Sequence, residues 1–146
     1  MPAHRARTDK LIIHCSDYSW GDAEEITRWH KERGFEDIGY HYVILNGRRK
    51  ANDTYNESID GLIEAGRSLD LQGAHCLTQN NRSIGICLIG KKDFTSDQMQ
   101  RLKELVRASC SFYGLDPTKD IYGHYEFEPK KTCPNLDMEK FRKEMA

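Results

Sequence analysis

Three side chains that can bind a metal or act as nucleophiles fall at separate points of this 146-residue chain. His14 ends the apolar segment KLIIH, His124 ends the segment IYGH, and Cys133 lies in the Pro-flanked loop EPKKTCPN. Two neutral imidazoles and one thiolate are zinc ligands, and a set of three leaves a fourth position for water, as catalytic zinc sites require. The residue types therefore point to a zinc site, although no local metal-binding motif spans His14 and His124.

The same loop also permits a cysteine hydrolase. In that interpretation Cys133 is the nucleophile and His124 is its base. A nearby lysine would lower the pKa of the thiol and so favour the reactive thiolate. This alternative leaves His14 and Tyr40 without a role. Activity that is lost to a chelator would argue against it, and activity of metal-free protein that is lost to thiol alkylation would support it.

The zinc interpretation needs two strands that end at one edge of a sheet. The segments KLIIH and IYGHY are short and apolar, as buried strands are, and each contains one of the two histidines. SIGICLIG is a nearly continuous apolar run, typical of a strand covered on both faces. GYHYVILN is rich in β-branched and aromatic residues, and GLIEAGR is its expected partner. We expect His14 and His124 to project from the same rim.

Helices are expected between these strands. Asp22 is positioned to cap a helix that ends near Gly34. A capping box at residues 95–98 begins a second helix, in which Phe112 belongs to the apolar pattern, and residues 137–144 form a third. Residues 47–59 are predicted to be a long protruding loop. The order of elements predicts an α/β fold, in which helices flank a mixed β-sheet in one domain, residues 10–146, after a tail, residues 1–9.

Composition narrows the class of protein. Hydrophobic residues make up 38% and charged residues 31% of the chain, and the formal net charge is −1, so we expect no nucleic-acid partner. The first apolar run is too short for a signal peptide or a membrane span, which predicts a cytoplasmic protein. The cysteine count of five is odd and favours reduced thiols. We expect a monomer.

Six segments of the chain, taken together, resemble a known family. They are IIHCS, RWHKERGFEDIGYHYVI, LIEAGR, GAHC, NNRSIGICLIG and GHYEFEPKKTCPNLD. In this order they are similar to zinc-dependent N-acetylmuramoyl-L-alanine amidases of the type 2 class, which share a fold with peptidoglycan recognition proteins. The resemblance is strongest to the amidase-type lysozymes of bacteriophages, and it covers about residues 11–141.

The resemblance implies specific roles for residues of this chain. It implies one zinc ion per chain with three ligands, namely His14, His124 and Cys133. It also implies that Tyr40 and Lys131 are catalytic side chains and that His75, in GAHC, contacts substrate. During amide hydrolysis, an ammonium group at Lys131 would stabilise negative charge on the carbonyl oxygen, and Tyr40 would bind water or pass a proton to the leaving amine.

The implied activity is hydrolysis of the amide bond between N-acetylmuramic acid and L-alanine in peptidoglycan. The implied setting is a phage or prophage endolysin that reaches the cell wall after release from the cytoplasm. Two alternatives stay open, a cytoplasmic amidase that recycles muropeptides and a peptidoglycan-binding module without activity. Relatives of the second kind typically lack the third, cysteine-type ligand that Cys133 supplies here.

The chain departs from the family pattern at three places. Cys87 stands where many recycling amidases carry a glutamate, so that carboxylate cannot be the general base here. The loop EPKKTC is one residue longer than in similar phage enzymes, which makes Lys130 an alternative to Lys131. Residues 47–59 also exceed the short hairpin tip of the family.

The remaining histidines have simpler interpretations. His41 alternates with Tyr40 along a strand, so we expect it to point to the opposite side and to be buried. His30, on a helix, and His4, in the tail, are interpreted as surface residues.

Overall fold

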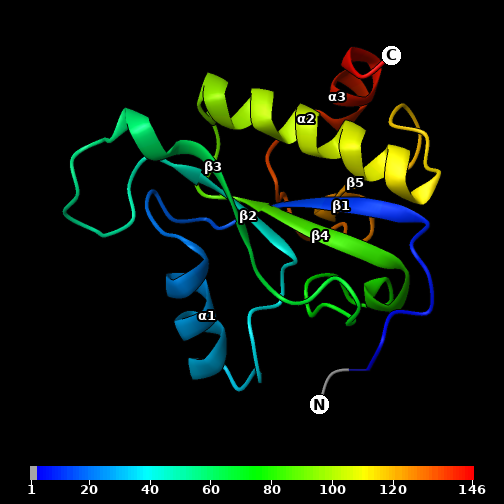
Figure 1. The fold of residues 1–146 in the computed structure, drawn as a ribbon, viewed down its shortest axis with the longest axis horizontal. Coiled ribbons are helices and arrows are strands. Elements are labelled where there is room, and N and C mark those ends of the chain that lie inside the picture. Colours follow the sequence, from blue (N-terminus) through cyan, green and yellow to red (C-terminus); the bar gives the residue numbers. More distant parts are fainter. Residues whose placement is uncertain (1–2) are drawn as a thin grey trace.

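Five strands form one mixed sheet in the computed structural model, which describes residues 3–146 (Figure 1). The strands are β1 (Lys10–Cys15), β2 (Tyr42–Asn46), β3 (Asp60–Ala65), β4 (Ser83–Leu88) and β5 (Ile121–Gly123). Their order across the sheet is β3-β2-β4-β1-β5. Only the edge strand β3 is antiparallel to its neighbour, and the other pairs are parallel. The predicted mixed sheet is confirmed.

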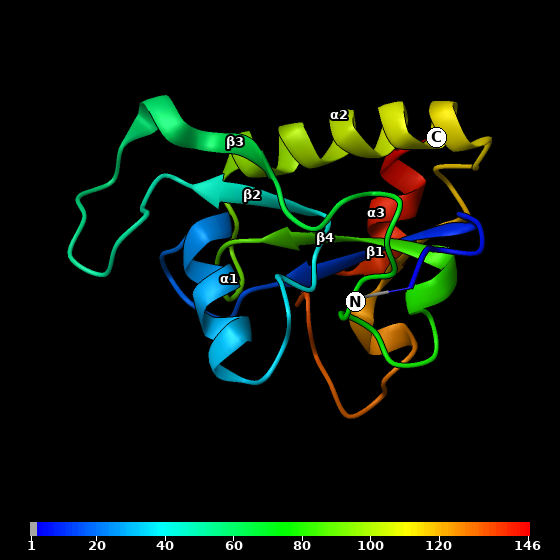
Figure 2. The ribbon, with the colours of Figure 1, turned by 60° about the horizontal axis from the view of Figure 1, so that its bottom comes forward.

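Helices cover both faces of this sheet (Figure 2). The helices are α1 (Ala23–Glu32), α2 (Ser96–Tyr113) and α3 (Met138–Glu144). Successive strand residues point to opposite faces, so Ile44 packs in the core beneath α2 and α3, whereas Val43 and Leu45 pack with Ile26 of α1. Ile13 belongs to the α2 face, so its neighbour His14 points to the α1 face. No helix within residues 3–146 is long and apolar enough to cross a membrane.

The helix boundaries follow the predicted capping residues. Thr95 and Gln98 form the reciprocal capping box at the start of α2, and Gly114 ends that helix with φ 70°. Asp22 caps α1 through Oδ1, which accepts a hydrogen bond from the backbone N–H of Glu25 at 2.8 Å. Local side-chain chemistry is therefore sufficient to place both helices.

Phe112 does not follow the prediction. It was expected on the apolar face of α2, but it is 81% exposed. The buried stripe of α2 runs through Leu102, Val106 and Cys110. Steps of three or four residues keep a helical stripe on one face, and Phe112 lies two residues after Cys110, on another side of the helix.

The described part of the predicted tail, residues 3–9, packs along the segment between β3 and β4. His4 forms a bridge with Leu71. Arg5 donates from its backbone to Asp70 at 2.9 Å and from Nε to the carbonyl of Leu69 at 2.6 Å. Residues 1 and 2 of that tail lie outside the described residues.

Candidate metal centre

The C-terminal ends of β1 and β5 bring two histidines together. The two strands are parallel neighbours, with Ile13 opposite Gly123. His14 and His124 are the next residues on each strand path, and their ring centroids are 4.5 Å apart. His124 begins a short 3-10 helix, η3 (His124–Glu126). The structure thus places both predicted histidines at one rim of the sheet.

The loop after η3 folds back to place a thiol beside them. Tyr125 donates its backbone N–H to the carbonyl of Cys133 at 2.9 Å. The backbone N–H of Cys15 points at Sγ of Cys133 from 3.1 Å, and the same sulfur is 4.0 Å from Nδ1 of His14. The Cys133–Pro134 peptide bond is cis. Candidate ligand atoms of His14, His124 and Cys133 all lie within 4.8 Å of one another.

This donor set fits zinc. Zinc holds sulfur at about 2.3 Å and imidazole nitrogen at about 2.0 to 2.1 Å, so two donors about 4 Å apart can share one ion. Nε2 of His124 contacts the carboxylate of Glu128, which can accept a hydrogen bond from it. A carboxylate that accepts the N–H of one ring nitrogen leaves the lone pair of the other nitrogen for a cation.

The protonation states favour cation binding over thiol catalysis. Burial lowers the pKa of His14 well below its ordinary value and also lowers the pKa of His124. Both rings are therefore neutral near neutral pH, as metal ligands must be. Hydrogen bonding with the side chain of Cys15, together with burial, raises the pKa of the Cys133 thiol and outweighs the opposite effect of the Cys15 backbone N–H. A nucleophilic cysteine needs a lowered pKa, whereas a bound cation displaces the thiol proton.

His124 and Cys133 line a cavity of about 540 Å³, and His14 beside them is 1% exposed. Tyr40 lines it, and the centroid of its ring is 5.0 Å from that of His14. Burial raises the pKa of Tyr40 well above its ordinary value, so its phenol stays protonated at neutral pH. Lys130 and Lys131 both line the same cavity. The structure therefore gathers the predicted tyrosine and both candidate lysines around the donor set.

His75 also lines the cavity, but most of its side chain is buried. Only 7% of the residue is exposed. Its Nδ1 lies 2.8 Å from Nε2 of His14, and its Nε2 lies 3.3 Å from the hydroxyl of Ser83. Both ring nitrogens of His75 therefore already contact protein atoms. One of these contacts is with His14, a candidate metal ligand.

The burial of two other histidines, His41 and His30, can be compared with what the sequence predicted. His41 is 1% exposed, and its ring bonds to the carbonyl of Leu71 at 2.8 Å and to the backbone N–H of Gly85 at 3.1 Å. The expected burial of His41 is confirmed. His30 was expected on the surface, and this was wrong. It is 7% exposed, because its Nδ1 accepts a hydrogen bond at 2.9 Å from the backbone of Gly39, in the segment that folds back along α1.

Sequence reasoning missed two groups that hold the candidate ligands. Glu128 follows His124 by one helical turn, and its carboxylate contacts the imidazole. The backbone N–H of Cys15 stabilises negative charge on the sulfur of Cys133. The four-residue spacing of His124 and Glu128 was a usable signal, whereas the contact of Cys15 with Cys133 depends on tertiary structure.

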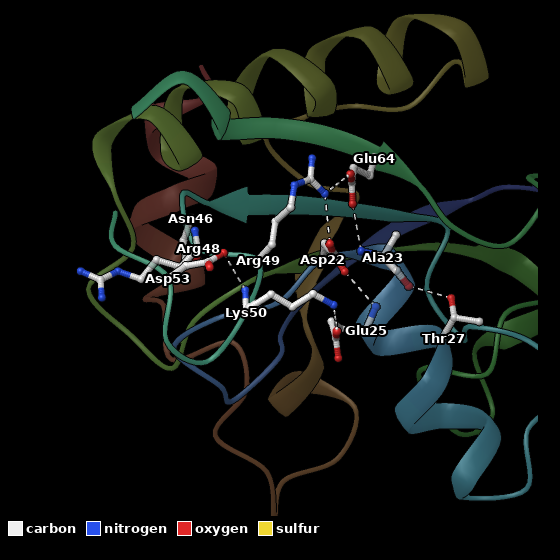
Figure 3. A network of polar contacts seen from close by, with 10 residues as sticks. All are labelled: Asp22, Ala23, Glu25, Thr27, Asn46, Arg48, Arg49, Lys50, Asp53 and Glu64. Atoms are coloured by element: carbon white, nitrogen blue, oxygen red, sulfur yellow. Dashed lines mark hydrogen bonds and ion pairs between the residues drawn. The ribbon is translucent and has the colours of Figure 1, made fainter. Parts of the chain in front are cut away.

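The first part of the loop at 47–59 is fixed to the start of α1 (Figure 3). Arg49 reaches Asp22 at 3.1 Å and Glu64 at 2.8 Å, and the Lys50 ammonium contacts the buried carboxylate of Glu25. The cavity beside the donor set is lined by other parts of the described chain, among them residues 15–18 and 130–133. This loop therefore lies outside the candidate site.

Fold and site together describe a mixed α/β protein with a His, His, Cys cluster that could hold a metal ion at one rim of its sheet. The chain belongs to the N-acetylmuramoyl-L-alanine amidase family, whose sequence pattern matches residues 4–136. The predicted resemblance is confirmed, and the protein is an amidase.

Similar proteins agree with this family assignment. An endolysin of Enterobacteria phage K11 is 33% identical, and the match covers 95% of this chain and 88% of the phage protein. The N-acetylmuramoyl-L-alanine amidase LysC from Clostridium intestinale URNW has a TM-score of 0.76 at 24% identity, covering 94% of this chain and 85% of LysC. Drosophila PGRP-LB has a TM-score of 0.72 at 23% identity, and the match covers 98% of this chain and 83% of PGRP-LB. The two structural likenesses show the fold.

Proposed function

We propose that this protein hydrolyses the amide bond between N-acetylmuramic acid and L-alanine in peptidoglycan, using one zinc ion per chain held by His14, His124 and Cys133. The observation that carries this proposal is the cluster of their donor atoms within 4.8 Å of one another, beside a cavity that also holds Tyr40 and Lys131. We assign the catalytic domain to residues 10–146.

The side chains around the cavity divide the chemistry between them. Zinc, when bound, polarises a carbonyl group and lowers the pKa of water. The Lys131 ammonium stabilises the negative charge that grows on the carbonyl oxygen, an interaction stronger in the transition state than in the ground state. Tyr40 keeps its proton at neutral pH and can donate it from Oη to the departing amine.

One observation favours an endolysin as the biological setting. The relative from phage K11 bears that name and is covered over most of its length. We propose that the protein acts on the cell wall as a monomer after release from the cytoplasm, with neither a nucleic-acid nor a membrane partner.

The direct test is hydrolysis of purified peptidoglycan and of a soluble muropeptide by the zinc-loaded protein. New amino groups on L-alanine are expected from both substrates, with faster release from intact wall. Activity should disappear with a chelator and return with zinc. Cleavage of the soluble muropeptide alone would instead identify a recycling amidase. Binding to the wall without cleavage would identify a recognition module.

A further inference from the structure

The ring of His75 contacts a candidate metal ligand and is itself held by a second side chain, an arrangement to which the proposed function assigns no task. We infer that His75 is a positioning residue, which, together with Ser83, fixes the tautomer and orientation of His14 so that Nδ1 of His14 faces the metal position. This inference rests on the proposed function and deepens it. It replaces substrate contact as the role of His75, because both ring nitrogens are already bonded within the protein.

The hydrogen bonds determine which atom carries the proton on Ser83, on His75 and on His14. The hydroxyl of Ser83 lies 2.8 Å from the carbonyl oxygen of Gln79, which can only accept, so the single hydroxyl proton points there. The Ser83 oxygen must then accept from Nε2–H of His75. A neutral His75 with its proton on Nε2 has an acceptor at Nδ1, which receives the Nε2–H of His14.

The consequence falls on the other nitrogen of His14. With the proton held on Nε2, Nδ1 carries the free lone pair, and Nδ1 is the atom that faces Sγ of Cys133 at 4.0 Å. A metal-binding imidazole commonly donates its second N–H to a protein acceptor, and this contact fixes both its tautomer and its ring orientation. Here the acceptor is an imidazole rather than a carboxylate.

The surroundings leave His75 little freedom. Asn80 Oδ1 accepts from the backbone N–H groups of His75 at 3.0 Å and Cys76 at 3.1 Å. The ring lies directly over Gly85 of β4, where an added Cβ would come within 2.6 Å of the ring carbon Cγ. Gly85 therefore makes room for the imidazole, and a side chain held this tightly can transmit its orientation to His14.

Four variants separate positioning from packing. His75→Leu fills the space without an acceptor, whereas His75→Asn puts an oxygen near the place of Nδ1. Ser83→Ala removes the hydroxyl that accepts the proton of Nε2 without touching His14. His41→Leu is the packing control, because His41 is also buried beside Gly85 and its ring lies against His75 without contacting a candidate ligand. Zinc affinity is measured by chelator competition, and the cobalt-substituted proteins give ligand-field spectra.

We expect His75→Leu to weaken zinc affinity by about 10–100-fold and to shift the cobalt bands. His75→Asn should recover most of the affinity and the wild-type bands, Ser83→Ala should weaken binding in the same direction, and His41→Leu should bind zinc like wild type. Wild-type affinity in His75→Leu, or equal losses in His75→Asn and His41→Leu, would overturn the inference. Wild-type affinity in Ser83→Ala would overturn the part assigned to Ser83. Wild-type protein that binds zinc without cleaving peptidoglycan would overturn the proposed function alone.

Discussion

Sγ of Cys133 lies 4.0 Å from Nδ1 of His14, although the two residues are 119 positions apart in the chain. The sheet brings His14 to the rim, and the loop after η3 returns Cys133 to it. The sulfur also receives the backbone N–H of Cys15 at 3.1 Å, which stabilises negative charge there. The site is therefore preorganised for a cation by backbone geometry as well as by its three side chains.

The two neighbouring lysines should differ in their effect on turnover. Lys131→Met removes the ammonium group that we place at the carbonyl oxygen, and we expect kcat to fall by about 10²–10³-fold, as when an oxyanion donor is lost. Lys130→Met, which also changes a lysine lining the cavity, is the matched control and should retain most of the activity. A larger loss in the control would transfer the role to Lys130.

Tyr40→Phe keeps the ring beside His14 and removes only the phenolic hydroxyl. We expect a fall in kcat of at least about 10²-fold, typical of a lost acid or base group, with unchanged zinc content. Steady-state kinetics on a soluble muropeptide, together with elemental analysis, measures both quantities. Zinc lost in parallel with activity would show that Tyr40 supports the site rather than the reaction.

Stability should fall in mildly acidic solution because buried histidines stay neutral in the folded protein. Burial lowers the pKa of His41 and of His30 to about 4, against about 6.5 in the unfolded chain. A lowered folded-state pKa of a base gives stability that is fully present above pH 6.5 and is lost as pH falls toward 4. Each such histidine lowers the free energy of unfolding by up to about 1.4 kcal/mol per pH unit as the pH falls between its unfolded-state and folded-state pKa values.

Urea unfolding of wild type and His41→Gln between pH 7.5 and 4.5 tests this expectation. The free energy of unfolding should decrease more steeply with falling pH in the wild type, so that the gap between the two proteins narrows. Parallel curves would show that His41 takes up no additional proton on unfolding.

Arg49 should stabilise the fold without taking part in catalysis. It joins Asp22, the cap of α1, to Glu64 of β3 (Figure 3). Arg49→Met leaves these half-buried or buried carboxylates without their cation, and we expect the free energy of unfolding to drop by about 1–3 kcal/mol. The exposed Arg48 gives the control, since Arg48→Met should change stability by less than about 0.5 kcal/mol. Urea unfolding measures both, and turnover of the soluble muropeptide should be unchanged in each.

Elements with strong local signals could be predicted from the sequence. The apolar run of β4, the capping box at Thr95 and the cap at Asp22 each depend on residues a few positions apart. The shared rim of His14 and His124 was predictable because parallel strands end at the same edge. Family resemblance was needed for Tyr40 and Lys131, since neither has a local pattern that separates it from an ordinary strand tyrosine or loop lysine.

The errors concern contacts between distant segments. His30 looked like a surface residue because its helix is amphipathic, but the chain at Gly39 folds back onto it. The contact of His75 with His14 spans 61 positions, and the ion pairs of Arg49 join two elements that precede and follow it. Helical and strand periodicity describe which face of an element is apolar, whereas partners of buried polar groups are set by tertiary packing.

The central claim is that His14, His124 and Cys133 hold one catalytic zinc ion. Elemental analysis of wild type and Cys133→Ala, each paired with an assay of amide cleavage on purified peptidoglycan, tests it most directly. We predict one zinc per chain with activity in the wild type, and loss of both in a variant that remains folded by circular dichroism. An active wild type without zinc, or a Cys133→Ala variant that keeps its zinc and its activity, would contradict the account.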